Sequence, residues 1–263
     1  MDASEIKKVG IAGLGALGSA VTRALLAGID GLRLECASEL NPPDEFDIEI
    51  VDFETLAARC DIIVECLPPA IVPKLAEAVF AEGKTLVLIS SCAFLMFPEI
   101  QKMHDLSTSR VLVPSGALAG LDGVKGLKEL GIEKSVIAST KPPRGFEGAP
   151  YVDKMGINLA QIESKTRIFE GSALEAAKGF PANVNVAATL SLAGIGAEQT
   201  RVEIWADPQA KGNSHEITVT GEFSTLHARI ENRPDPANPK SSMLAAQSIV
   251  AVLRDMNNAL VVL

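Results

Sequence analysis

The sequence is short of cysteine and of positive charge, and these shortages argue against several classes of protein. Four cysteines (Cys36, Cys60, Cys66 and Cys92) form no Cys-x-x-Cys pair and lie near no histidine cluster. We therefore expect reduced thiols, with neither a disulfide framework nor a metal site. Lysine and arginine number 24 against 33 acidic residues, giving a net charge of −9, which argues against nucleic acid or an anionic membrane as a partner.

Long apolar segments are also missing. No run reaches the roughly 18 apolar residues that a membrane-spanning helix needs. The residues before Val9 contain no apolar signal region, so we expect a cytoplasmic protein. With 263 residues, of which 47% are hydrophobic and 22% charged, the chain is typical of a globular protein of about two domains.

The most informative segment is Gly13-x-Gly15-x-x-Gly18, which follows the apolar segment Val9–Ala12 and begins an alanine- and leucine-rich helix. In such a motif the first glycine permits a tight turn, the second lets a pyrophosphate approach, and the third allows helix and strand to pack closely. Helix N–H groups then bind the phosphates. A structural turn is the alternative for a glycine motif taken alone. The residues expected at the cofactor are Gly13, Gly15, Ala16, Leu17 and Gly18.

Residues 1–113 alternate short apolar strands with helices, which predicts an α/β dinucleotide-binding domain with a Rossmann-type, doubly wound parallel sheet. The predicted strands are Val9–Ala12, Leu32–Ala37, Ile48–Val51, Asp61–Cys66, Thr85–Ser90 and Arg110–Val113. The predicted helices are Ala16–Ala27, Phe53–Arg59, Pro73–Ala81 and Pro98–Ser107.

Residues 114–239 predict a second, α+β domain with a largely antiparallel sheet, expected to carry catalysis and dimerisation. Its predicted strands are Ser135–Ser139, Arg201–Ala206, His215–Glu222 and Thr225–Glu231, the last two as a hairpin. Helices are expected near Ala173–Lys178 and Val184–Ala193, and the segment Thr140–Pro150, with three prolines and two glycines, is expected to be irregular. A final helix, capped by Ser241 or Ser242 and lying within residues 240–263, is expected to pack back on the first domain.

Among the three histidines, His215 has the pattern of a site residue. His104 and His227 lie in polar surroundings and are expected to face solvent. Period-two spacing places His215 on one face with Ile217 and Val219, so it is either a buried core residue or a proton-transfer group.

Four other polar residues have two interpretations each. Asn183 and Asn185 either cap a helix or bind a ligand, and Lys141 and Arg144 either face solvent or bind a carboxylate.

The end of the second predicted strand bears on the choice of cofactor. An acidic residue about 20 residues after the glycine motif would bind the ribose of NAD. Here Ser38 stands where the acid is expected, and Glu39 lies one residue later. No lysine or arginine for a 2′-phosphate is nearby, so NAD is slightly favoured over NADP.

Six segments, in order and spacing, resemble the L-aspartate dehydrogenase family. They are Gly10–Gly18, Pro114–Asp122, Thr140–Pro143, Phe180–Ala188, Gly212–Ile217 and Asn238–Met243. The resemblance implies oxidation of L-aspartate to iminoaspartate with NAD or NADP, and a role in NAD (pyridine nucleotide) biosynthesis. It places the catalytic histidine at His215, the cofactor-binding asparagine at Asn185 and the cofactor-binding alanine at Ala117 or Ala119. Many relatives have aspartate where this chain has Ser38, which leaves the choice between NAD and NADP open.

On this interpretation the substrate is a dicarboxylic amino acid. Lys141, Arg144 and Lys240 are the candidates for its two carboxylates. His215 would act as a base on the substrate amine, directly or through a water. We also expect a homo-oligomer, with a dimer formed through the second-domain sheet. The alternatives are a related two-domain enzyme, such as a dihydrodipicolinate reductase or homoserine dehydrogenase, and a non-catalytic NAD(P)-sensing protein.

Overall fold

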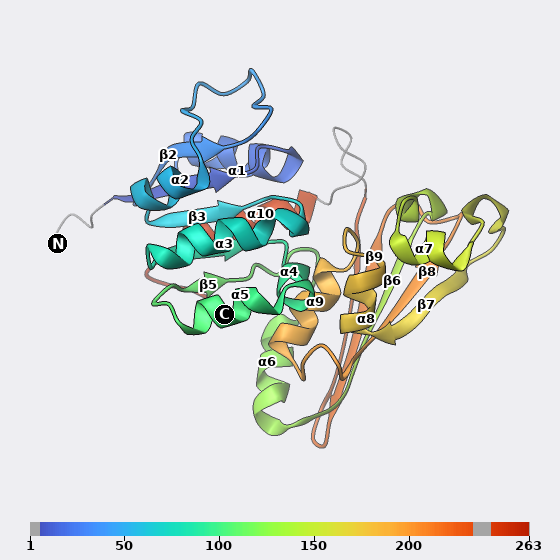
Figure 1. Cartoon of the computed structure of the whole chain (residues 1–263). Helices are drawn as coiled ribbons and strands as arrows, with labels where there is room; N and C mark the ends of the chain where they lie inside the picture. Colours follow the sequence, from blue (N-terminus) through green and yellow to red (C-terminus); the bar gives the residue numbers. More distant parts are fainter. Residues whose placement is uncertain (1–5, 234–242, 263) are drawn as a thin grey trace. The chain divides into compact units, whose positions relative to one another are not determined.

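The chain divides into two compact units, Met1–Pro114 with Met243–Leu263, and Ser115–Ser242. This division comes from a computed structural model that describes residues 6–233 and 243–262 (Figure 1). Each unit contains its own five-stranded sheet. Within the described residues, no helix has the length and apolarity to cross a bilayer.

The first unit is built on a parallel sheet with strand order β2-β1-β3-β4-β5, which confirms the predicted doubly wound fold. Its strands are β1 (Lys7–Ala12), β2 (Leu32–Ser38), β3 (Ile62–Glu65), β4 (Thr85–Leu88) and β5 (Val111–Leu112). Because β2 and β3 lie on opposite sides of β1, the chain changes direction at β1. The loops that leave the carboxyl ends of β1 and β3 therefore form a topological switch point, where such sheets bind ligands.

Helices cover both faces of this sheet, which explains why its strands have apolar cores without polar alternation. On one face, α1 (Ala16–Leu26) and α10 (Met243–Asp255) pack over residues such as Ile62 and Val64. Ile63 faces the opposite core, which is covered by α2 (Phe53–Arg59), α3 (Val72–Ala81) and α5 (Pro98–Asp105). The shorter helices η1 (Pro69–Ile71) and α4 (Cys92–Met96) follow β3 and β4.

The C-terminal helix α10 completes one of these cores. Ile249 and Leu253 are fully buried in the cluster that also contains residues of β1 and α1, whereas Leu244, in the first turn of the helix, is 41% exposed. Asn257 follows the helix and donates a hydrogen bond to the Asp30 carbonyl at 2.8 Å. The predicted capping residues Ser241 and Ser242 lie outside the described residues.

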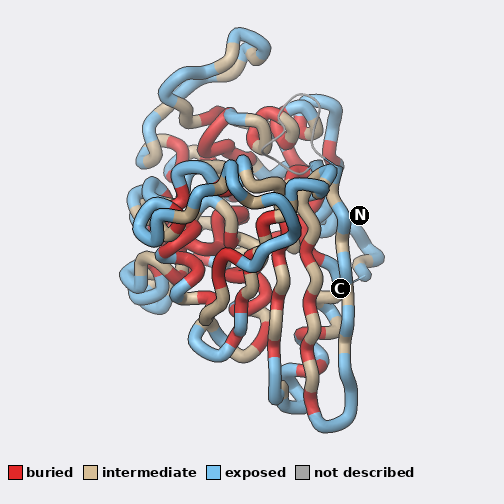
Figure 2. Tube along the Cα trace, turned by 90° about the vertical axis from the view of Figure 1, so that its right-hand side faces the viewer, coloured by how far each residue is buried: buried red, intermediate tan, exposed pale blue. Residues whose placement is uncertain are grey.

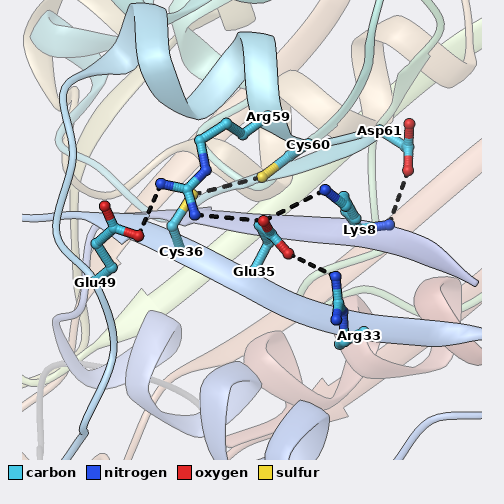
Figure 3. Close-up of polar contacts among 8 residues, drawn as sticks. All are labelled: Lys8, Arg33, Glu35, Cys36, Glu49, Arg59, Cys60 and Asp61. Carbon is cyan, nitrogen blue, oxygen red and sulfur yellow. Dashed lines mark hydrogen bonds and ion pairs between the residues drawn. The ribbon is translucent and has the colours of Figure 1, made fainter.

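A cluster of charged side chains joins β1, β2 and α2 at the opposite end of the sheet from the switch point (Figure 3). The half-buried carboxylate of Glu35 contacts Lys8, Arg33 and Arg59 at 3.4, 2.9 and 3.3 Å. Next to Glu35 in sequence, Cys36 has its thiol 3.7 Å from that of Cys60. All four cysteines are free. Burial raises the pKa of Cys60 to about 12, so this thiol stays protonated and packs as an apolar group.

One predicted strand of the first unit is wrong. Residues Ile48–Val51 form only an isolated bridge, in which Ile50 pairs with Ala37. Two backbone hydrogen bonds to Ala37 make up this pairing. The pairing stops because Asp52 accepts a hydrogen bond from the Thr55 N–H and begins helix α2.

The second unit is built on a mixed sheet with strand order β10-β9-β6-β8-β7. Its strands are β6 (Ile132–Lys141), β7 (Thr166–Ser172), β8 (Thr200–Ala206), β9 (Ser214–Gly221) and β10 (Thr225–Glu231). Only β6 and β8 pair in parallel, so the predicted, largely antiparallel sheet and its β9–β10 hairpin are confirmed. The helices of this unit are α6 (Leu121–Leu130), η2 (Pro143–Phe146), α7 (Pro150–Met155), η3 (Leu159–Gln161), α8 (Ala173–Gly179) and α9 (Asn185–Ala193).

Two features of the second unit differ from the sequence prediction. The segment Thr140–Pro150 is not irregular throughout, because β6 extends to Lys141 and two helices begin with Pro143 and Pro150. Proline is excluded from helix interiors but not from first turns, so these prolines begin the helices. Strand β7 was not predicted, since the charged residues that suit an edge strand hide its apolar pattern.

Burial alternates along the central strands of this sheet, as the tube in Figure 2 shows. His215, Ile217 and Val219 are buried on one face, which confirms the predicted period-two pattern. Glu216 and Thr218 lie on the opposite face. Strand β9 therefore carries an imidazole into an otherwise apolar layer.

Candidate active site

The glycine loop between β1 and α1 has a distinct geometric requirement at each glycine. Gly13 has a φ of +94°, and a side chain there would lie 2.6 Å from the Cys66 carbonyl oxygen. A side chain at Gly18 would overlap the Gly13 carbonyl oxygen. Gly15, by contrast, has open space around it. The first and third glycines are thus required for packing, and the second leaves room for a ligand.

Helix α1 begins at Ala16, directly after the open position at Gly15, and Leu17 follows in its first turn. Its N-cap residue, Gly15, has no side chain to accept a backbone hydrogen bond, and no acidic residue lies in the first turn. The helix N-terminus therefore presents N–H groups and a partial positive charge at an open glycine. These residues fit the pyrophosphate of a dinucleotide.

Glu39, rather than Ser38, supplies the carboxylate at the end of β2. Glu39 Oε2 accepts the Leu14 N–H of the glycine loop at 2.7 Å, and Oε1 accepts the N–H groups of Leu40 and Asn41 at 2.8 and 3.2 Å. Burial opposes ionisation, but these backbone bonds outweigh it and hold the pKa of Glu39 below its usual value. Ser38 contributes its backbone carbonyl, which accepts the Gly13 N–H at 2.8 Å.

A second carboxylate lies at the end of β3. Glu65 is fully buried and accepts the backbone N–H groups of Leu67, Ile89 and Ser90 at 2.6, 3.2 and 2.9 Å. Burial outweighs these hydrogen bonds and raises the pKa of Glu65 to about 7. Because Leu67 follows β3 and Ser90 follows β4, this one side chain fixes two loops at the switch point.

In the second unit, His215 is held from the neighbouring strand. Antiparallel pairing places it directly opposite Ser139 of β6, and the Ser139 hydroxyl is 2.9 Å from His215 Nδ1. A serine hydroxyl both donates and accepts, so it can hold either neutral tautomer of the ring. His215 itself is only 4% exposed.

Lys141 lies two residues beyond Ser139 on β6, on the same face of the sheet. Its Nζ donates to Asn183 Oδ1 at 2.8 Å, across 42 residues of sequence. Burial lowers the pKa of Lys141 to about 8. Burial, with a smaller effect of the nearby Lys141 charge, lowers the pKa of His215 to about 3. We call Ser139, Lys141, Asn183 and His215 the His215 cluster.

The other predicted site residues of this unit lie in several settings. Asn185 begins α9 two residues after Asn183. Ala117 is buried, whereas Ala119 is exposed. Arg144 is exposed in η2, three residues after Lys141. Lys240 lies outside the described residues.

The two other histidines have structural surroundings. His104 is partly buried rather than fully exposed as predicted, since its Nε2 lies 3.1 Å from the Ser109 carbonyl and its ring packs edge-on against Phe80. His227 faces solvent on β10 as predicted, near Glu216. Residues 6–233 and 243–262 contain no group of three histidine, cysteine or acidic side chains placed to hold a metal ion.

Comparisons with known proteins agree on one family. A profile described as "Aspartate dehydrogenase, C-terminal" matches residues 122–256. L-aspartate dehydrogenase 3 of Bordetella bronchiseptica is 40% identical, and the match covers 98% of this chain and 97% of that protein. L-aspartate dehydrogenase of Methanosarcina barkeri is 37% identical, and the match covers 94% of this chain and 96% of that protein. The crystal structure of aspartate dehydrogenase from Thermotoga maritima matches with a TM-score of 0.78 and 27% identity, covering 97% of this chain and 99% of that one.

The buried, neutral state of His215 leads to a prediction about stability. Because its pKa in the folded state lies below that of an unfolded histidine, near 6.5, the unfolded chain binds the extra proton between about pH 3 and 6.5. The contribution of neutral His215 to the unfolding free energy is therefore present above pH 6.5 and is lost as the pH falls toward 3. From pH 7 to pH 5, wild type should lose about 2 kcal/mol more unfolding free energy than His215→Gln.

Urea unfolding at each pH measures this difference. His227→Gln, which replaces an exposed histidine of the same unit, is the matched control and should keep the wild-type pH dependence. Equal pH dependence in wild type and His215→Gln would show that the imidazole is not held neutral by the fold.

Proposed function

This chain belongs to the aspartate dehydrogenase family, and we propose that it oxidises L-aspartate to iminoaspartate with NAD or NADP as the oxidant. The observation that carries the proposal is the His215 cluster, a hydrogen-bonded imidazole beside a lysine of lowered pKa on a buried sheet face. Two nitrogen bases in a poorly solvated position are suited to removing a proton from an amine and of little use to a structural core.

We propose that the first unit binds the cofactor. The open backbone at Gly15 and the first turn of α1 would hold the pyrophosphate, while Gly13 and Gly18 keep the loop closely packed. Glu65 fixes the neighbouring loops. When bound, the nicotinamide supplies the acceptor for the hydride that leaves the substrate Cα.

The second unit is proposed to hold the amino acid. His215 would form a hydrogen bond through Nε2 to the reacting nitrogen or to a water beside it, with Ser139 fixing the ring. Arg144 and Lys240 are proposed for the substrate carboxylates, because an arginine fork pairs with a carboxylate through two parallel hydrogen bonds. Lys141 is a further cation for a carboxylate, although its lowered pKa makes it the weakest of the three as a fixed charge. Asn185 and either Ala117 or Ala119 would contact the cofactor.

The imine product hydrolyses to oxaloacetate and ammonia, or is passed on. We propose that it supplies NAD biosynthesis, the role implied by the family resemblance. We also propose a cytoplasmic location, since four free cysteines suit a reducing compartment.

The direct test incubates the pure protein with NAD or NADP and one of L-aspartate, D-aspartate, glutamate or homoserine, and records the absorbance of the reduced cofactor. The proposal expects reduction with L-aspartate. Reduction with homoserine alone would favour a homoserine dehydrogenase, and no reduction with any amino acid would favour a cofactor-sensing protein.

His215→Ala should lower kcat by roughly 10²–10⁴-fold, because the reacting nitrogen loses the imidazole that would form a hydrogen bond with it. Cofactor affinity, measured by fluorescence titration with NADH, should stay within about threefold of wild type, because no residue of the glycine loop changes. His104→Ala is the control in the first unit and should leave kcat unchanged. Undiminished turnover in His215→Ala would remove this residue from the reaction.

Glu39 is proposed to set the preference for NAD over NADP. Three of its roughly four acceptor positions hold backbone N–H groups, which leaves one on Oε2 for a ribose hydroxyl. A 2′-phosphate at that position would meet a carboxylate that stays ionised. The acid therefore favours NAD by attraction to a hydroxyl and by repulsion of a phosphate.

Glu39→Gln removes the charge and keeps an acceptor for the Leu14 N–H. It should raise the ratio of kcat/KM for NADP to that for NAD by about 10–100-fold, as one to three kcal/mol of repulsion is lost. Asp44→Asn removes the same charge from an exposed position in the following loop and should leave the ratio unchanged. A ratio that is the same in Glu39→Gln and wild type would exclude this role.

We propose that the second-unit sheet forms a homodimer through the face opposite His215. The residues on this face include Val136 and Ala138 at the centre of the sheet, both only partly buried, and Trp205 on β8. Charged side chains surround them in mutual pairs, such as Arg201 with Glu170 and Arg229 with Glu216. A central apolar strip with a paired polar rim suits a symmetric contact between identical sheets.

Light scattering after size exclusion tests the dimer. Wild type should have twice the mass of one chain, and Val136→Glu, which places a charge at the centre of the face, should shift it to the single-chain mass. Glu133→Lys on the same strand, at an exposed position near its end, is the control. A wild-type mass of one chain would contradict the proposal.

A further inference from the structure

The His215 cluster contains two nitrogen bases, and its geometry separates their roles. We propose that Lys141, rather than His215, accepts the proton that the substrate ammonium must lose before the Cα hydride can leave. This inference rests on the proposed function, because it concerns the proton balance of amino-acid oxidation. It assigns Lys141 a catalytic role in place of a fixed positive charge for a carboxylate.

The groups around Lys141 favour its neutral form. Its ammonium donates to a neutral amide, Asn183 Oδ1, and no carboxylate in residues 6–233 and 243–262 forms an ion pair with it. On β8, the Asp207 N–H donates to the Lys141 carbonyl, while the Asp207 carboxylate accepts the Gln209 N–H. From η2, a side chain in place of Gly145 would touch the lysine stem, and Arg144 of the same element is exposed. From β9, His215 adds no negative charge.

A lysine in such surroundings gives up its proton readily. An ammonium loses hydration on burial, and an amide oxygen compensates less than a carboxylate would. Burial accordingly lowers the pKa of Lys141 to about 8, so a substantial share of the side chain is neutral under mildly alkaline conditions. Neutral amine is the form that can accept a proton.

His215 is poorly suited to accepting the same proton. Its ring is buried at 4% exposure, and the Lys141 charge lies close enough to oppose a second positive charge. The imidazole therefore stays neutral, with one nitrogen on Ser139 and the other able to form a hydrogen bond with the reacting nitrogen. Its role is to orient that nitrogen, and the proton goes to the lysine.

The step balances as follows. An N–H bond of the substrate ammonium breaks, its electron pair stays on the nitrogen, and the Lys141 Nζ lone pair forms the new N–H bond. The freed pair on the substrate nitrogen would then form the C=N bond as the Cα–H bond breaks, and a bound nicotinamide would supply the acceptor for the hydride. Asn183 Oδ1 remains an acceptor for the lysine in both its neutral and its charged state.

The kinetic test compares wild type, Lys141→Arg and Lys141→Ala with L-aspartate across pH 6–10. Lys141→Arg keeps the charge but cannot release a proton at these pH values. We expect its kcat to fall by roughly 10²–10⁴-fold. The wild-type inflection near pH 8 in kcat/KM should also disappear. Added methylamine should partly restore kcat in Lys141→Ala. Lys154→Arg, at an exposed site of the same unit, is the control.

A carboxylate-binding lysine gives a different result. Lys141→Arg would then keep kcat and the pH inflection and change mainly KM, and methylamine would not restore Lys141→Ala. That result overturns the proposal. If wild type reduces neither cofactor with any amino acid, the proposed function fails, and with it this role.

A measurement that does not depend on turnover separates failure of the Lys141 proposal from failure of the proposed function. Reductive methylation with ¹³C-formaldehyde labels the lysines for NMR, and the signal absent from Lys141→Arg identifies Lys141. It should titrate near pH 8, whereas an unperturbed lysine titrates near 10.4. Titration of the Lys141 signal with the exposed lysines would overturn the assignment even in an active enzyme.

Discussion

The fold places two nitrogen bases on one poorly solvated sheet face, where burial and mutual repulsion disfavour a positive charge on both. His215 and Lys141 lie on β9 and β6, whose register sets Ser139 directly opposite the histidine. Their close partners are a hydroxyl and an amide rather than carboxylates. Desolvation then acts against a charge on either base and repulsion acts against a charge on both. The chemistry proposed for the second unit follows from this constraint.

The first unit uses negative charge in a complementary way. At the carboxyl ends of its strands, Glu39 and Glu65 accept backbone N–H groups and so fix the loops around the open glycine. The two carboxylates differ because Glu65 is fully buried, which raises its pKa to about 7, while Glu39 keeps its pKa below the usual value. The ionised acid at the end of β2 is the one that we propose selects between cofactors, while the buried one fixes two loops.

Local patterns in the sequence predicted the parts of the fold that depend on local interactions. The glycine motif with its following helix, the apolar strands of the parallel sheet and the face of His215 all follow from residues close together in the chain. The extension of β6 to Lys141 was missed, because it depends on pairing with β8 and β9 on both sides. Strand β7 was missed because the charged residues of an edge strand obscure its apolar pattern. Residues Ile48–Val51 do not form a full strand because helix α2 begins directly after them.

The side-chain contacts of the site could not be predicted in the same way. Ser139 and His215 are 76 residues apart and meet through the register of β6 and β9. Lys141 and Asn183 are 42 residues apart and meet only because the turn before α9 lies against the end of β6. Glu39 was set aside for Ser38 on spacing alone. The longer side chain of Glu39 reaches back to the Leu14 N–H. A carboxylate one residue after the expected place therefore still lies beside the glycine loop. The histidine itself was identified through a family resemblance more than through its pattern.

In the proposed reaction the substrate amine, not a carboxylate, lies against Lys141 and His215. A crystal structure of the protein with NAD and L-2-methylaspartate tests it most directly, because this analogue keeps the amine and both carboxylates but has no Cα hydride to lose. The account predicts the analogue nitrogen within about 3.2 Å of both Lys141 Nζ and His215 Nε2. A carboxylate oxygen on Lys141 Nζ, with the amine pointing elsewhere, would contradict it.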